Sequence, residues 1–397
     1  MSEGLNILMV APEPVFEPRG TPFSVVYRAR SLCRAGHRVD LLTYPYGRDP
    51  KIDGLRVIRV PKVPGVRGVR IGPSPAKVVL DAMLTVRMAG LLSVNAYDLI
   101  WSHEEAGLLC GPLSRLLGVA HIYDMHSDLS QQIMNYAPFD RQPFVGVFSG
   151  ITRVMVHTAD VVLTICDDLV SAVRTIAPRK RVLLVENYCT AVDFLDDPVP
   201  SVDAVRREMG LNGVPTAVYI GSLEPYQGLD ILLGAADYLA GRKCRCKMVI
   251  VGGSAGQVER LRERAASMNL GDVVHVVGQV PPAAVASYVE AADILLMSRS
   301  MGTNVPLKIY SYMKSGKPIV ATRIESHTQL LSDENAMLSE TDGTSFGRAI
   351  ERLIDNPGLG RRLAEAAGRS AGDFSEERFD RNLALALEWA MASRRGT

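Results

Sequence analysis

The 397-residue sequence contains no apolar run long enough to cross a bilayer. A spanning helix needs about 18 consecutive apolar residues, and Asp81 and Arg87 interrupt the best candidate. The first strand-like run begins at Asn6, with no charged-then-apolar signal pattern before it. These absences predict a cytoplasmic protein, with peripheral contact on the inner membrane face as its only membrane association.

The sequence also lacks the usual metal-binding and P-loop motifs. Its six cysteines are scattered, and the one close pair, Cys244 and Cys246, has no second pair with which to complete a zinc site. They are interpreted as reduced structural thiols. A P-loop and a metal-binding histidine cluster are absent. We therefore expect no essential metal ion and no bound cofactor.

Acidic residues are missing from one stretch, residues 54–80. That stretch carries six cations, which are Arg56, Arg59, Lys62, Arg67, Arg70 and Lys77. Such a run is commonly a solvated face. Because valine, isoleucine and proline separate the cations, it also suits anionic phospholipid headgroups or an anionic acceptor. It is too sparse and too poor in aromatic residues to predict nucleic-acid binding.

Short runs rich in valine and isoleucine alternate with helical segments in two series. One series begins at NILMVAP (6–12) and the other at PTAVYIGS (215–222). This alternation predicts an α/β fold with two doubly wound parallel sheets. We expect domains at 1–195 and 196–375, divided within the Asp- and Pro-rich segment 193–203, and a C-terminal helix (376–397) that returns to the first domain. Ligands of such sheets bind at the carboxyl ends of the strands, which predicts a site in a cleft between the domains.

Residues 292–331 form the most informative segment. An apolar run at 294–297 predicts a buried strand, followed by a glycine-containing loop, a helix starting near Pro306 and a second apolar run at 319–321. Asn304 suits an N-cap, Pro306 the first helical turn, and Lys308 adds a positive charge. The pattern predicts a loop and helix N-terminus that bind a phosphate, with an ordinary crossover connection as the alternative.

Several motifs follow one another in an order typical of a known family. They are AGHRVDLLT (35–43), ADVVLTICDDL (159–169), VYIGSLEPYQGLDILLGAA (218–236), VGGSAG (251–256) and GTNVPLKIYSYMKSGKPIVAT (302–322). In this order they resemble the GT-B glycosyltransferases, and in detail those of family 4. The resemblance covers nearly the whole chain. It implies two Rossmann-like domains that face a cleft.

The same resemblance implies a retaining enzyme that moves a sugar from a UDP or GDP sugar to an acceptor hydroxyl. Its partners would be the nucleotide sugar and a saccharide or lipid-linked acceptor, in glycan, glycolipid or cell-envelope polysaccharide synthesis. The alternatives are an inactive GT-B scaffold and a GT-B sugar-nucleotide epimerase. An epimerase would need carboxylates for acid and base catalysis, and Asp124 has no evident partner for that role.

The sequence departs from the family pattern where charged residues usually contact the donor. The Arg and Lys that hold the diphosphate correspond to Ser222 and Gln227, and the two glutamates correspond to Thr303 and Ser311. Three accounts are open: relocated cations hold the diphosphate, the domain has become a scaffold, or the glutamates lie elsewhere. We favour the first account, with Arg299 and Lys308 as the cations, because Arg can bind phosphate through two hydrogen bonds.

His126 is the main catalytic candidate, because it follows a strand and corresponds to a family histidine that contacts the donor sugar. A neutral imidazole there can favour charge that develops on the sugar. Asp124 and Asp128 flank it and are expected to orient its ring or raise its pKa. His327 is a more remote candidate.

The remaining predicted site residues fall into two groups. The donor-binding residues are Gly20, Thr21, Gly221, Ser222, Gln227, Arg299, Gly302, Thr303, Asn304, Val305, Lys308 and Ser311. The acceptor-side residues are Arg19, His103 and Glu104. Gly20 and Thr21 belong to a predicted loop (19–22) after the first strand, where glycine would let the backbone approach the donor phosphates closely.

Overall fold

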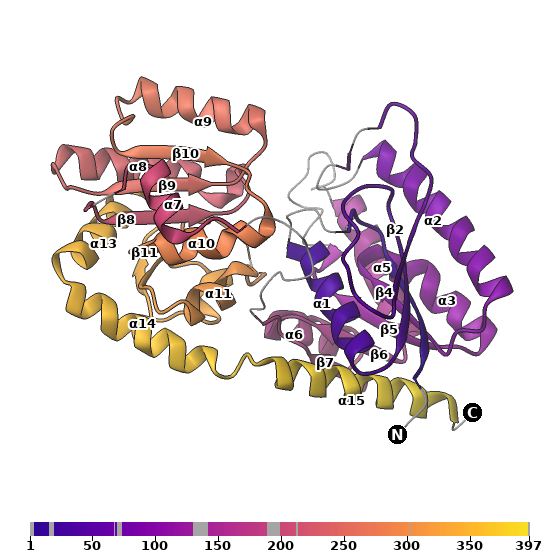
Figure 1. Ribbon diagram of the computed structural model, residues 1–397. Helices are drawn as coiled ribbons and strands as arrows, with labels where there is room; N and C mark the ends of the chain where they lie inside the picture. Colours follow the sequence, from indigo (N-terminus) through magenta and orange to yellow (C-terminus); the bar gives the residue numbers. More distant parts are fainter. Residues whose placement is uncertain are drawn as a thin grey trace. The chain divides into compact units, whose positions relative to one another are not determined.

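The computed structural model describes residues 4–15, 20–66, 68–69, 74–129, 142–188, 199–211, 213–302 and 304–395. It divides the chain into two compact units (Figure 1). The first unit comprises Met1–Asn187 and Glu376–Thr397, and the second comprises Tyr188–Ser375. The chain therefore passes from one unit to the other twice.

The first unit contains a parallel sheet of seven strands in the order β3-β2-β1-β4-β5-β6-β7. The strands are β1 (Asn6–Ala11), β2 (Arg38–Thr43), β3 (Leu55–Arg59), β4 (Leu99–His103), β5 (Ala120–Met125), β6 (Val161–Thr164) and β7 (Val182–Leu184). Every residue of β4, β5 and β6 is buried, as expected for parallel strands covered on both faces. The strand order reverses direction between β1 and β4, which makes their carboxyl ends the switch point of this sheet.

Helices cover the two faces of this sheet. They are α1 (Gly20–Arg34), α2 (Pro75–Val94), α3 (Gly107–Leu117), α5 (Gln142–Thr158), α6 (Asp167–Ile176) and the C-terminal α15 (Glu376–Arg395). A short 3-10 helix, η1 (Glu104–Ala106), leads from β4 into α3. Leu8, Val10, Leu84, Met88 and Ile100 belong to a core cluster beneath α2 and α3.

The second unit contains a parallel sheet of six strands in the order β10-β9-β8-β11-β12-β13. The strands are β8 (Thr216–Ile220), β9 (Lys247–Val251), β10 (Val274–Gly278), β11 (Ile294–Met297), β12 (Ile319–Thr322) and β13 (Met337–Ser339). Here the order reverses between β8 and β11, which pair directly. Their carboxyl ends therefore form the switch point at which a doubly wound sheet binds its ligand.

The helices of the second unit are α7 (Val202–Glu208), α8 (Leu229–Gly241), α9 (Ala255–Ser267), α10 (Val285–Ala291), α11 (Lys308–Lys314), α12 (Glu325–Thr328), α13 (Gly343–Asp355) and α14 (Pro357–Ala371). Two 3-10 turns, η2 (Pro225–Gln227) and η3 (Pro282–Ala284), precede α8 and α10. The core cluster of this unit combines residues of α8, α9 and α13 with the strands, including Leu232, Leu261 and Phe346.

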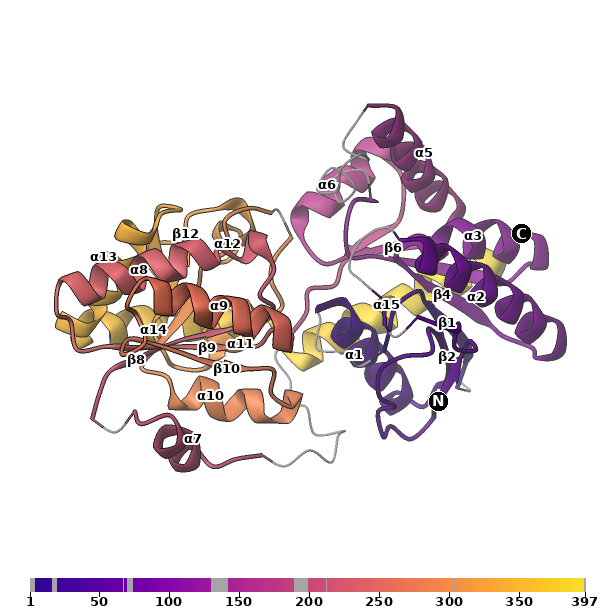
Figure 2. The same ribbon diagram turned by 90° about the horizontal axis from the view of Figure 1, so that it is seen from above.

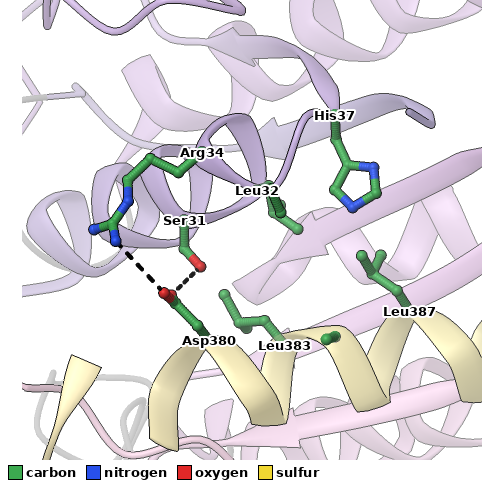
Figure 3. Close-up of a pocket in the computed structure, with 9 residues that line it drawn as sticks. Ser31, Leu32, Arg34, His37, Asp380, Leu383 and Leu387 are labelled. Atoms are coloured by element: carbon green, nitrogen blue, oxygen red, sulfur yellow. Dashed lines mark hydrogen bonds and ion pairs between the residues drawn. The ribbon is translucent and has the colours of Figure 1, made fainter. Parts of the chain in front are cut away.

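Helix α15 packs on the first unit, against α1 and the strands β5, β6 and β7. Ser31 donates a hydrogen bond to Asp380, and Arg34 contacts both Asp380 and Glu376. Figure 3 shows the two Asp380 contacts beside a small pocket lined by α1 and α15 residues, among them Leu32 and Leu383. The pocket contains none of the predicted site residues, so we assign it to the packing of α15.

Two predicted local structures are wrong. Gly20 and Thr21 lie in the first turn of α1, not in a loop, because the helix begins before Pro22, a residue that an N-terminal turn accepts. Asn304 is not an N-cap, because α11 begins at Lys308 after Leu307. The Asn304 carbonyl instead accepts a hydrogen bond from Arg299 at 2.9 Å, which keeps this segment out of the helix.

The α8–α13 contact depends on two glycines and gives a test of the fold. A Cβ on Gly343 would lie 2.5 Å from the Gly234 Cα atom, so the two backbones touch with no room for a methyl group. Gly343→Ala should lower the free energy of unfolding by about 1–3 kcal/mol, the usual cost of overpacking. Urea denaturation measures it. Gly241→Ala is the control, since a Cβ there meets nothing within 4 Å, and an equal loss in both variants would contradict the close contact.

Candidate active site

In the first unit, the predicted residues His103, Asp124 and His126 lie together at the carboxyl ends of β4 and β5. The exposed fraction of His126 is 3%, and His103 and Asp124 are fully buried. His126 Nε2 lies 3.1 Å from Asp124 Oδ1, and His103 Nδ1 lies 3.4 Å from His126 Nε2. His126 therefore lies in a polar cluster below the surface.

Asp124 is held by a residue that the sequence analysis missed, Arg28 of α1. The two form an ion pair in which both side chains are fully buried. The Trp101 indole also donates to Asp124 Oδ2, at 3.1 Å. Burial by itself would raise the pKa of Asp124, but the Arg28 guanidinium and His126 outweigh it and hold that pKa well below its usual range. Asp124 is therefore a fixed carboxylate at neutral pH.

The histidines of this cluster are neutral at pH 7. Burial lowers the pKa of His103 to about 3, with Asp124 opposing the shift. Burial also lowers the pKa of His126, more than the Asp124 carboxylate raises it. The prediction that the flanking acids raise the His126 pKa is therefore wrong, because desolvation of a buried imidazolium outweighs one carboxylate that Arg28 already neutralises.

Glu104 adjoins this cluster in a strained backbone conformation. Its φ angle of 48° lies in the left-handed region, which is uncommon for a residue with a side chain. Ser127 donates to its carboxyl group at 3.1 Å. Burial and the neighbouring Glu105 raise the pKa of Glu104 to about 8. Such strain persists only where surrounding contacts enforce it, which is common at functional sites.

The donor atoms of His103, Asp124 and His126 lie within 4.8 Å of one another, a spacing that a metal ion could use. Their surroundings do not fit one. Arg28 already neutralises the Asp124 carboxylate, and a cation bound there would lie close to the guanidinium. We therefore interpret the cluster as a hydrogen-bonding group rather than a metal site.

In the second unit, the predicted donor-binding residues meet at the switch point. The loop after β8 and the loop after β11 are tied together by hydrogen bonds from Ser298 Oγ to the Gln227 carbonyl (2.7 Å) and from the Ser300 amide to the Tyr226 carbonyl (2.9 Å). Gly228 has a φ of 74°, and a Cβ there would lie 1.8 Å from the Ser298 carbonyl oxygen. A glycine is therefore required where the two loops cross.

Lys308 lies beneath these loops. Its Nζ donates to the Ile220 carbonyl at 3.0 Å and lies 4.1 Å from the Tyr219 ring centroid. A Cβ on Gly221 would come within 3.3 Å of Nζ, so the bare glycine leaves the ammonium group room. Burial, with a smaller contribution from Arg299, lowers the pKa of Lys308 to about 7.

Arg299 is the second cation of this site. Its guanidinium packs over the Tyr226 ring, 5.5 Å from the centroid, and its Nε is buried without a hydrogen-bond partner. Within the described residues, no carboxylate forms an ion pair with Arg299 or Lys308. In the described part of the chain, no acidic side chain therefore neutralises either cation. Binding of an anion at this position would stabilise both charges.

The other donor-side residues occupy supporting positions. Gln227 Nε2 donates weakly to Ser222 Oγ at 3.4 Å, and Ser311 Oγ bonds back to the Lys308 carbonyl. Gly302 has a φ of 121° and Val305 is buried. Arg19 and Thr303 lie outside the described residues. His327 is fully buried near the two cations, with its Nε2 unpaired.

Residues 54–80 include no acid, but acidic side chains from other segments lie next to three of their cations. Arg56 pairs with Asp40, Arg59 with Asp49, and Lys77 with Glu105. Arg67 and Arg70 lie outside the described residues, and Lys62 is exposed. Contact of this stretch with an anionic membrane stays a prediction, weakened by three neutralised cations.

Comparison with known proteins places both units in one class. Residues 20–188 match the model described as "Glycosyl transferase 4-like domain", and residues 214–356 match "Glycosyl transferases group 1". The chain is 29% identical over 322 residues to the D-inositol 3-phosphate glycosyltransferase of Acidothermus cellulolyticus, which covers 75% of this chain and 68% of that protein.

Solved structures share the fold. The sucrose-phosphate synthase of Thermosynechococcus elongatus has a TM-score of 0.80 and 18% identity, over 98% of this chain and 100% of that one. Anabaena Alr3699/HepE in complex with UDP and glucose has a TM-score of 0.72 and 16% identity, over 97% and 99%. At these identities the structures establish the fold alone, and they confirm the two predicted parallel-sheet, Rossmann-like domains.

Arg28 gives the test of the first-unit cluster. Arg28→Met leaves the Asp124 carboxylate buried without its cation, which should cost about 3–5 kcal/mol of unfolding free energy. The double variant Arg28→Met/Asp124→Asn should recover most of that loss, because no uncompensated charge remains. Thermal and urea denaturation measure both, with the exposed Arg38→Met as control. A double variant as unstable as the single one would show that Arg28 acts by packing rather than by charge.

Proposed function

We propose that this chain, which is a GT-B glycosyltransferase of the group 1, family 4-like type, transfers a sugar from a nucleoside diphosphate sugar to an acceptor hydroxyl with retention of configuration. The observation that carries the donor assignment is the pair of half-buried cations, Arg299 and Lys308, at the β8/β11 switch point without a carboxylate partner among the described residues. Two cations of this kind suit a diphosphate, which carries two negative charges.

Relatives and structural neighbours support this donor class. One relative is a D-inositol 3-phosphate glycosyltransferase, and another is the phosphatidyl-myo-inositol mannosyltransferase of Mycolicibacterium smegmatis. HepE was crystallised with UDP and glucose. Glycan or glycolipid synthesis is the coarse role, and UDP or GDP is the proposed nucleotide. The acceptor is a saccharide or a lipid-linked glycan.

Retention follows the family resemblance, and the chemistry of the first unit is compatible with it. The Asp124 carboxylate is sequestered by Arg28, so it is a poor nucleophile for a covalent intermediate. In the proposed reaction the bond from the sugar carbon to the diphosphate oxygen breaks as the bond to the acceptor oxygen forms. The acceptor proton passes to the leaving diphosphate, and no protein nucleophile takes part.

His126 is assigned to the sugar. Its neutral imidazole, held by Asp124 at 3.1 Å, provides a preorganised polar group that stabilises positive charge developing on the sugar ring. The epimerase alternative is not supported, because an acid–base carboxylate must gain and lose a proton near neutral pH and the pKa of Asp124 is held far below that range.

The donor site predicts a specific pH dependence. Lys308 loses its proton near pH 7 in the free protein, and a bound diphosphate favours the charged form. Affinity for a nucleoside diphosphate sugar should therefore be highest below pH 7 and weaken by up to about tenfold per pH unit above it, because binding takes up a proton. A nucleotide sugar is the correct ligand, since its esterified diphosphate does not titrate in this range.

Isothermal titration calorimetry at several pH values measures this effect. Lys308→Met should abolish the pH dependence, and Arg299→Ala should weaken binding by about 1.5–3 kcal/mol, the contribution of a charge-assisted hydrogen bond. Lys314→Met, at the exposed end of the same helix, is the matched control. Affinity unchanged in both Lys308→Met and Arg299→Ala would refute the proposed donor site.

Turnover tests the role of His126. His126→Gln keeps a polar side chain in the cluster but removes the imidazole, and kcat should fall by about 10²–10³-fold, as on loss of one preorganised catalytic group. Donor affinity should stay near the wild-type value, because the cations belong to the other unit. Circular dichroism must show a folded variant, since His126 is only 3% exposed. Turnover within threefold of wild type would move the role to His103.

A further inference from the structure

One face of the first unit exposes aliphatic side chains to solvent. Among the described residues, nine of the twelve exposed large hydrophobic side chains belong to α2, α3 and α5. They are Val78, Val79, Val86, Val94, Leu109, Leu116, Leu117, Val147 and Val154. Val86, Val94 and Leu116 are 74%, 77% and 82% exposed, so packing within the unit does not account for them.

These three helices form a single layer. Each connects parallel strands in the same direction across the sheet, and right-handed crossovers therefore place all three on one face, together with α6, which joins β6 to β7 in that direction. Figure 2 shows them on the side of the sheet opposite α1 and α15. Cys110 Sγ lies 3.5 Å from Met88 Sδ, which joins α3 to α2. Arg115 of α3 donates to the His157 carbonyl of α5. The exposed side chains thus share one surface, here named the α2–α3–α5 face.

The exposed charges of α2, α3 and α5 have one sign, and the exposed acids Asp167 and Asp168 belong to the first turn of the neighbouring α6. Arg87, Arg115 and Arg153 are exposed. The sequences of α3 and α5 contain no acid, and the one acid of α2, Asp81, is half-buried and accepts a hydrogen bond from Tyr44. An ordinary solvated helix mixes charges, as α9 does with Glu259 and Glu263 among its arginines. The α2–α3–α5 face lacks that mixture.

Apolar side chains interspersed with cations complement a surface that is negatively charged outside and apolar beneath. That description fits a bilayer containing anionic lipid, where aliphatic groups enter the headgroup boundary and arginines contact phosphates. A second copy of the chain fits less well, since a symmetric contact would oppose arginines to arginines. A protein hot spot would be expected to include exposed tryptophan or tyrosine, and the nine exposed side chains are valine and leucine only.

We propose that the α2–α3–α5 face binds the surface of anionic membranes. No described helix is long and apolar enough to span a bilayer, so the contact is peripheral. This inference does not depend on the donor site. Lys308→Met should bind membranes as the wild type does, so that failure of one proposal can be told from failure of the other.

The test is co-sedimentation of the full chain with vesicles of phosphatidylcholine alone and with vesicles containing equal parts of phosphatidylglycerol. The wild type should sediment with the anionic vesicles and stay largely in solution with the neutral ones. Val86→Asp/Val94→Asp should lower the bound fraction at least tenfold, because it places two charges where aliphatic groups would insert. Both side chains are exposed, so the fold should be retained, and thermal denaturation checks this.

The matched control is Val199→Asp/Met268→Asp, which changes the net charge equally at two exposed positions of the second unit. Its vesicle binding should stay within twofold of the wild type. Equal losses in both double variants would show a net-charge effect and overturn the proposal, as would an absence of wild-type binding to anionic vesicles. A wild-type dimer in light scattering that Val86→Asp/Val94→Asp converts to monomer would assign the face to a second copy instead.

Discussion

The buried ion pair between Arg28 and Asp124 is the contact on which the first unit depends. Arg28 also reaches the Val185 carbonyl at 3.4 Å and the Asn187 side chain at 3.3 Å, and it lies over the Phe379 ring. Asn187 and Phe379 adjoin the two points at which the chain leaves and re-enters this unit. One guanidinium therefore connects both crossings to the carboxylate that holds His126.

The two units differ in whether a cation of the candidate site has an acidic partner. In the first, the cation has a carboxylate partner and the histidines are neutral, so the cluster is rigid and carries little net charge. In the second, Arg299 and Lys308 lie close together and the described residues supply no acid to pair with them, at the cost of a lowered Lys308 pKa. A site that keeps two cations partly desolvated is unfavourable until an anion arrives, whereas a rigid neutral cluster suits the orientation of a reacting sugar.

The surface charge of a segment also differs between its own sequence and its surroundings in the folded structure. The stretch 54–80 has no acid in its own sequence, yet Asp40, Asp49 and Glu105 come from other segments and neutralise three of its cations. The sequence of α2, α3 or α5 taken alone does not reveal an exposed apolar face, because each helix also has a buried apolar side. Only their assembly in one layer brings the valines, leucines and arginines together.

The sequence by itself determined the two parallel sheets, because strand period, glycine and proline positions and apolar runs are local signals. It also located His103, Asp124, His126, Arg299 and Lys308 at strand or helix ends. The helix starts at Gly20 and Lys308, the neutral state of His126 and the role of Arg28 were decided by the tertiary structure. Arg28 follows Val25 by one turn on the buried side of α1, which was its only sequence signal. The effect of a buried charge depends on its partner. The partner of Arg28 is Asp124, which lies 96 residues further along the chain.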